Sequence, residues 1–144
     1  MEMEKRIKLL EFAYAGALAD AVLRYNREGI LEKVTEDKKK ELQFTAAKQN
    51  QAFSVKEPAD VFLNLSEVFN CAKWEISKEA EKFIAVNQSC MLCGLAKQMN
   101  AGNPCDIFCL NPMQAMITAL GDFDYQVEDT LWTGKKCKVV VTQK

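Results

Sequence analysis

The chain has 144 residues, of which 49% are hydrophobic and 27% charged, and its formal net charge at neutral pH is −1. These values predict one domain that can bury a hydrophobic core, and they argue against a general nucleic-acid-binding protein, which needs a basic excess. No stretch resembles a transmembrane helix, and no apolar core of a signal peptide follows the charged start of the chain. We therefore expect a cytoplasmic protein with no membrane partner.

Residues 1–70 are predicted to be helical. A helix over 4–27 is indicated by an apolar stripe that we expect to pack on the protein's own core. A second helix is predicted over roughly 30–53, although Thr35 could instead cap a fresh helix. Pro58 suits the first turn of a third helix over 58–70. The stripes expected to be buried are Ile7, Leu10, Tyr14, Ala17, Leu18, Ala21 and Tyr25 in the first helix, Ile30, Val34, Leu42, Ala46 and Phe53 in the second, and Val61, Leu65, Val68 and Phe69 in the third.

From Cys71 onward the pattern becomes mixed. Alternating residues predict a strand near 72–76, a turn at 77–80 and a second strand at 82–87, which together make a hairpin. Ser89 is predicted to cap a helix from Cys90 to about Met99, and a loop at 100–104 ends that helix. The segment 105–110 is ambiguous and is followed by a helix at 112–120. A second hairpin is predicted from a strand at 123–131, a turn at 133–136 and a final strand that begins at Cys137.

These elements predict an α+β fold, in which N-terminal helices pack on an antiparallel sheet and further helices are inserted between two hairpins. We expect residues 1–144 to form a single domain, with a helical part at 1–70 and a cysteine-rich mixed part at 71–144. Small residues of the first helix, among them Ala13, Gly16 and Ala17, could also pack against a second subunit. A homodimer therefore remains open.

Candidate chemistry is concentrated in the cysteines. The chain has six cysteines and no histidine, and Cys90, Cys93, Cys105 and Cys109 fall within a window of 20 residues. Thiols are then the only side chains that ionise naturally near neutral pH and also act as soft metal ligands. Because Cys90 and Cys93 follow a predicted strand and open a predicted helix, the helix N-terminus should favour a thiolate there.

Four interpretations of the cysteines remain open. Cys90, Cys93, Cys105 and Cys109 could bind zinc tetrahedrally, whereas their spacing fits an iron–sulfur cluster less well. Cys90 and Cys93 could form a thiol–disulfide site. A single cysteine could be a nucleophile that relies on the helix N-terminus, Lys97 or Asp106, since no histidine base exists. Finally, free cysteines are often simply buried, which is the interpretation we favour for Cys71 and Cys137 taken singly.

The C-terminal half also resembles a known family. The resemblance is carried by a cysteine that opens a helix after a strand, by the step Cys109-Leu110-Asn111-Pro112 into another helix, and by the ending from Val127 to Val139 that contains Thr133-Gly134 and Cys137. These features resemble the L-2-amino-thiazoline-4-carboxylic acid hydrolase-like family, which is related to the 4-vinyl reductase small-molecule-binding domain. The resemblance implies an α+β ligand-binding fold that is often dimeric, and it carries over the positions Cys90, Cys109 and Cys137.

Three functional hypotheses follow. The first is a protein that binds a small molecule or a metal through its cysteine cluster. The second is a hydrolase that opens a small cyclic C–N/C–S substrate, with catalysis by Cys90, Cys109 or Cys137. The third is a dimeric interaction scaffold without catalysis. Trp74 and Trp132 could line a ligand cavity, although core packing is the commoner use of a strand aromatic.

Overall fold

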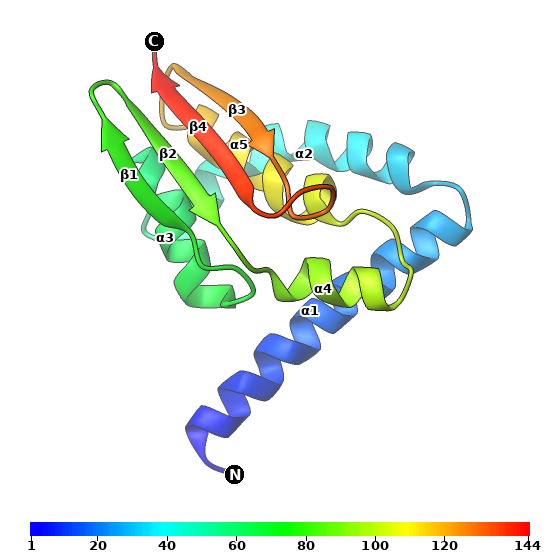
Figure 1. Cartoon of the computed structure of the whole chain (residues 1–144). Helices are drawn as coiled ribbons and strands as arrows, with labels where there is room; N and C mark the ends of the chain where they lie inside the picture. Colours follow the sequence, from blue (N-terminus) through cyan, green and yellow to red (C-terminus); the bar gives the residue numbers. More distant parts are fainter.

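The computed structural model describes all residues from Met1 to Lys144. Three N-terminal helices precede a half in which strands and helices are mixed (Figure 1). The elements are α1 (Met3–Arg27), α2 (Leu31–Ala52), α3 (Pro58–Phe69), β1 (Glu75–Glu79), β2 (Lys82–Asn87), α4 (Met91–Gln98), η1 (Asp106–Leu110), α5 (Asn111–Thr118), β3 (Phe123–Asp129) and β4 (Cys137–Gln143).

The four strands form one antiparallel sheet in the order β1-β2-β4-β3. The two predicted hairpins are present and are joined through β2 and β4, where Ala85 is paired with Val139. The helical segments α4, η1 and α5 lie between the hairpins in the chain. The α+β class with N-terminal helices and an antiparallel sheet is therefore confirmed.

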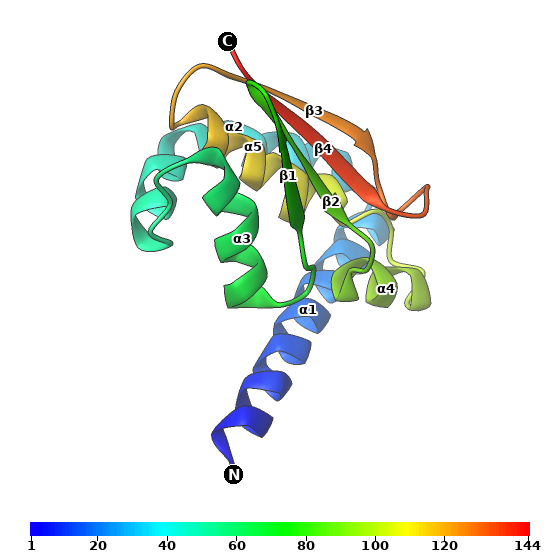
Figure 2. The ribbon, with the colours of Figure 1, turned by 60° about the vertical axis from the view of Figure 1, so that its left-hand side comes forward.

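Helices α2, α3 and α5 cover one face of the sheet (Figure 2). The main core lies between them and includes Phe62, Trp74 and Met116. The rings of Phe62 and Trp74 meet edge to face, with centroids 5.1 Å apart. Ala85, Val139 and Val141 supply the buried side of the two central strands. Cys137, Val139 and Val141 form the buried face of the last strand, because alternate residues of a strand point to the same side of the sheet.

Helix α1 packs on α4 through its C-terminal half, and its N-terminal half extends away from the body (Figure 1). The buried residues of α1 are Ala15, Ala19 and Val22, whereas Ile7 and Leu10 are 47% and 58% exposed. The prediction that Ile7 and Leu10 pack on the core is wrong, because α4 covers only the C-terminal half of the helix. Tyr14 does have a partner, since its ring stacks on Phe69 with centroids 5.0 Å apart. No helix is both long enough and apolar enough to cross a membrane.

The helix boundaries agree with the predicted ones within two residues in α1, α2 and α3. Helix α2 continues through Thr35, whose hydroxyl donates to the carbonyl of Leu31 at 2.7 Å instead of capping a new helix. Pro58 begins α3 as predicted. Two burial predictions are wrong: Val68, which lies on the solvent-facing side of α3, is 53% exposed, and Ile30, which is the cap residue before α2, is 39% exposed.

Two predictions around the first hairpin need correction. The strand β1 begins at Glu75, and Ser77 belongs to the strand, so the turn lies at Ala80 and Glu81. Ala80 has a φ of 54° there, in the left-handed region that a tight turn uses. Ser89 is not the cap of α4. Its own N–H donates to Asn87 Oδ1, and Cys90 is the cap residue.

Candidate functional site

The structure brings together the ends of several elements at one end of the sheet. Cys90 caps α4, Cys137 begins β4, and Cys71 lies between α3 and β1. The segment at Cys71 runs beside the start of α4, because Ala72 and Cys90 form an isolated antiparallel bridge and the Met91 N–H donates to the Cys71 carbonyl at 2.7 Å. Cysteines that are far apart in the sequence thus become neighbours.

Asn87 holds this junction in place. Its side chain is only 2% exposed, and its Oδ1 accepts hydrogen bonds from the N–H groups of Lys73 and Ser89, at 3.2 and 3.3 Å. One buried amide therefore fixes the strand end, the segment before β1 and the approach to α4. No pattern in the sequence indicates this role of Asn87.

The ambiguous segment 105–110 is a π-helical turn that continues directly into α5. The Asn111 N–H donates to the Asp106 carbonyl, which is five residues earlier, as this turn type requires. The turn carries Cys109 on the side of α5 that faces the core, and Cys105 precedes it at 8% exposure. Such turns occur often at functional sites, but no periodic pattern in the sequence predicts them.

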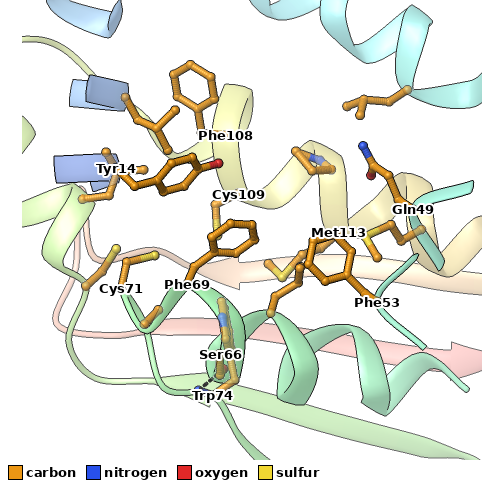
Figure 3. A pocket seen from close by; sticks show the side chains of 18 of the residues that line it. Tyr14, Gln49, Phe53, Ser66, Phe69, Cys71, Trp74, Phe108, Cys109 and Met113 are labelled. Atoms are coloured by element: carbon orange, nitrogen blue, oxygen red, sulfur yellow. Dashed lines mark hydrogen bonds between the residues drawn. The ribbon is translucent and has the colours of Figure 1, made fainter. Parts of the chain in front are cut away.

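A cavity of about 190 Å³ lies between α1, α2, α3, α5 and the Cys71 segment, and 15 of its 19 lining residues are hydrophobic. Figure 3 shows the rings of Tyr14, Phe53 and Phe69 turned toward this space, with Cys109 and Met113 beside them. The polar residues of the lining are Lys38, Gln49 and Ser66, together with the hydroxyl of Tyr14, and the lining contains no carboxylate. Trp74 also lines the cavity, which is one of the two roles that the sequence suggested for it, the other being core packing. Trp132 does not line it.

The Cys90 thiol has an unusual environment in the wall of this cavity. The Cys71 thiol hydrogen-bonds to its sulfur, and this contact, together with hydrogen bonds from the N–H groups of Cys93 and Leu92, lowers the pKa of Cys90 to about 6 although burial opposes ionisation. The Cys93 N–H lies 3.4 Å from the Cys90 sulfur. Because Cys90 caps the helix, the dipole of α4 acts in the same direction. Cys90 is therefore the cysteine at which the structure favours the thiolate.

The pKa values of the other five thiols are raised instead. The hydrogen bond to Cys90 and burial raise the pKa of Cys71, and burial raises the pKa of Cys93, Cys105, Cys109 and Cys137. Burial and the neighbouring Cys71 likewise raise the pKa of the Tyr14 hydroxyl. Cys90 is thus the one thiol in the cluster prepared for nucleophilic or ligand chemistry, and the proposed help from Lys97 is not required. Lys97 instead donates to the Leu131 carbonyl at 2.7 Å and lies over the Trp132 ring.

The four residues predicted to bind zinc, Cys90, Cys93, Cys105 and Cys109, do come together. With Cys137 they line a void of about 20 Å³, which is room for about one water molecule. No three of the cysteine, aspartate and glutamate side chains are arranged to hold a metal ion. The soft donors needed for zinc are therefore present without the geometry of a metal site, and zinc binding stays a prediction.

The three cysteines carried over by the family resemblance fall at this same junction. Cys90 and Cys109 line the larger cavity, and Cys137 lines the small void. The Cys137 sulfur accepts a hydrogen bond from the Leu131 N–H at 3.3 Å and so tightens the loop before β4. No protein-family model matches the sequence, and no match was found among the curated proteins. The family assignment therefore stays a prediction.

Proposed function

We propose that this protein binds a small, largely apolar molecule in the 190 Å³ cavity, with the Cys90 thiolate as the reactive or recognising group in its wall. The observation that carries the proposal is the coincidence of the two features. Cys90, the one cysteine whose pKa is lowered, borders the aromatic-lined cavity.

The size and lining of the cavity support a ligand role. Protein interiors are close-packed, so an apolar space of this size inside a small domain is unusual and weakens the core unless it is used. An engineered apolar cavity of about 150 Å³ in another protein accepts benzene or xenon. A cavity of about 190 Å³ therefore has room for a single ring with small substituents. A few polar groups in an apolar lining are typical of small-molecule sites.

Lys38 provides a second recognition group. Its amino group lies 4.3 Å from the centroid of the Phe108 ring, burial lowers its pKa, and it takes part in none of the ion pairs of the chain. A half-buried cation without an ion pair attracts an anionic or hydrogen-bond-accepting substituent. The lining therefore favours a ring that carries one acceptor or acidic group.

The hydrolase hypothesis is supported by the same thiolate, because a thiol ionised in advance needs no histidine to attack a ring carbon. The release of an acyl or imidoyl adduct, however, requires an activated water. Neither aspartate nor glutamate lines the cavity, and the remaining polar groups are neutral apart from Lys38. We therefore favour binding over turnover as the primary function.

Xenon, benzene, p-cresol and benzoate are suitable probes, with binding followed by nuclear magnetic resonance and by thermal shift. We expect at least one organic probe to raise the unfolding temperature, since a ligand at 100 times its Kd stabilises a protein by about 2.7 kcal/mol. Leu18→Trp should abolish binding by filling the cavity, whereas Leu63→Trp, on the exposed side of α3, should not. A wild-type protein that takes up neither xenon nor any of the organic probes would refute the proposal.

A further inference from the structure

Cys71 and Cys90 form a pair of thiols in contact, held by the backbone on both sides. The bridge between Ala72 and Cys90 and the 2.7 Å hydrogen bond from Met91 to Cys71 fix the two segments side by side. Both cysteines are half-buried and line the cavity, so a small solute that enters the cavity reaches their sulfur atoms. Figure 3 shows Cys71 at the edge of this space.

We propose that Cys90 and Cys71 are a peroxide-reactive pair, in which a small hydroperoxide oxidises Cys90 and the product closes to a Cys71–Cys90 disulfide. This modification site goes beyond ligand binding and does not depend on it. Two thiols on adjacent backbone segments, both in the wall of a cavity, are placed for a reversible disulfide.

The chemistry balances with the hydroperoxide as the only oxidant. The Cys90 thiolate attacks the terminal oxygen of the hydroperoxide, the O–O bond breaks, and the alkoxide or hydroxide leaves with a proton from water. Cys90 becomes a sulfenic acid, oxidised by two electrons. Cys71 then attacks the Cys90 sulfur, the S–O bond breaks, and hydroxide leaves as water with the proton of Cys71. Two thiols and one hydroperoxide thus give one disulfide, one alcohol or water, and one water.

The position of Cys90 at the start of α4 makes the order of events specific. Its sulfur accepts from the Cys93 N–H at 3.4 Å and lies at the positive end of the helix dipole, whereas Cys71 has no such position, so Cys90 reacts first. Oxidation of Cys90 removes the negative charge of its thiolate, and the Cys71 thiol then ionises more readily. The oxidation of Cys90 therefore favours the attack by Cys71 that completes the disulfide.

The remaining cysteines provide a matched comparison. Cys93 and Cys105 also contact each other, but they are 4% and 8% exposed, and burial raises the pKa of both thiols. The two thiols of this second pair are neighbours, but neither has a lowered pKa and neither lines the larger cavity. We expect it to stay reduced at peroxide concentrations that oxidise the first pair.

The test is a titration of the reduced full chain with hydrogen peroxide, followed by intact mass and peptide mapping. One equivalent should lower the count of free thiols from six to four and give a Cys71–Cys90 cross-linked peptide. Cys90→Ser should slow thiol loss at least about tenfold. Cys71→Ser should leave a Cys90 sulfenic acid that dimedone traps, and the double variant Cys93→Ser/Cys105→Ser should behave as the wild type.

Several outcomes would overturn the inference. They are a Cys93–Cys105 cross-link formed first, equal oxidation of all thiols, or no faster reaction at Cys90 than at the other cysteines. Where a variant does not fold, dimedone and alkylation footprints of the wild-type chain answer the same question. Xenon binding measured on the same reduced sample separates failure here from failure of the ligand proposal.

Discussion

The ionisation of Cys90 can be tested through its main hydrogen-bond donor. The variant Cys71→Ala removes the thiol that lowers the pKa of Cys90 most, and leaves the N–H groups of Leu92 and Cys93 in place. A hydrogen bond to a charged group contributes about 1.5–3 kcal/mol, which corresponds to about 1–2 in pKa. We therefore expect the pKa of Cys90 to rise from about 6 to about 7–8 in this variant.

The assay must measure a pH midpoint and not a single rate. At pH 7 a thiol with a pKa of about 6 is ionised about 90-fold more than one with the ordinary pKa of 9.0. Its thiolate is intrinsically less nucleophilic, by about 20-fold for that difference in pKa, so the net rate advantage is only about fourfold. The rate of iodoacetamide alkylation at Cys90, followed by peptide mass spectrometry from acid to alkaline pH, gives the midpoint directly.

The matched variant is Cys71→Ser, which keeps a hydroxyl donor at the same position and should leave the Cys90 midpoint near the wild-type value. Cys137→Ser, whose sulfur does not contact Cys90, should also have no effect on it. A wild-type midpoint near the ordinary cysteine value would refute the electrostatic argument. An unchanged midpoint in Cys71→Ala would refute the role given to Cys71.

Four further predictions follow. Because folding lowers the pKa of Cys90 to about 6, stability against urea should increase as the pH rises from about 6 to 8. Above about 9 stability should fall again, because the buried thiols with raised pKa values ionise only in the unfolded state. A stability that does not change with pH would contradict this prediction. Asn87→Ala should lower the free energy of unfolding by about 2 kcal/mol, because two backbone N–H groups lose their acceptor, and a loss below about 0.5 kcal/mol in a urea titration would contradict it. If two chains associate through the exposed side of α1, light scattering should give a dimer that Leu10→Glu dissociates and Lys5→Glu does not, whereas a monomeric wild type would end this prediction. Metal analysis of protein purified without oxygen should find six free thiols and no stoichiometric zinc if ligand binding is the primary function, and about one zinc per chain with four protected thiols would instead support the zinc site.

The sequence predicted the fold well where one period dominates. The boundaries of β2 agreed to the residue, and Pro58 marked the start of α3, because alternation and proline geometry act locally. The burial of the first helix was not predictable in the same way. Ile7 and Leu10 belong to a clear apolar stripe, but which part of a helix is covered depends on where distant elements end. In α1 the buried residues, Ala15, Ala19 and Val22, all lie beyond the first half of the helix.

The cysteines of the site could be predicted from the sequence, but their arrangement in space could not. The crowding of Cys90, Cys93, Cys105 and Cys109 indicated chemistry, and the lowered pKa of Cys90 follows from a helix start that the sequence also predicted. For Cys71, the neighbour that lowers the pKa of Cys90 most, the sequence predicts only a buried cysteine. Its approach to Cys90 depends on a bridge between segments that are separated by a whole hairpin, and no local pattern records such a pairing.

Because the chain has no histidine, other groups must favour the ionisation of Cys90. A lone cysteine in an apolar pocket would be protonated at neutral pH, because burial penalises the thiolate. Here the protein overcomes that penalty at one position only, with a second thiol and the first N–H groups of α4 as donors, while burial keeps Cys109 in the same cavity neutral. A general base is then unnecessary for attack by Cys90. The lining also limits the chemistry of the site. A cavity without a carboxylate can form an adduct with Cys90, but it has no general base to activate the water that would hydrolyse the adduct.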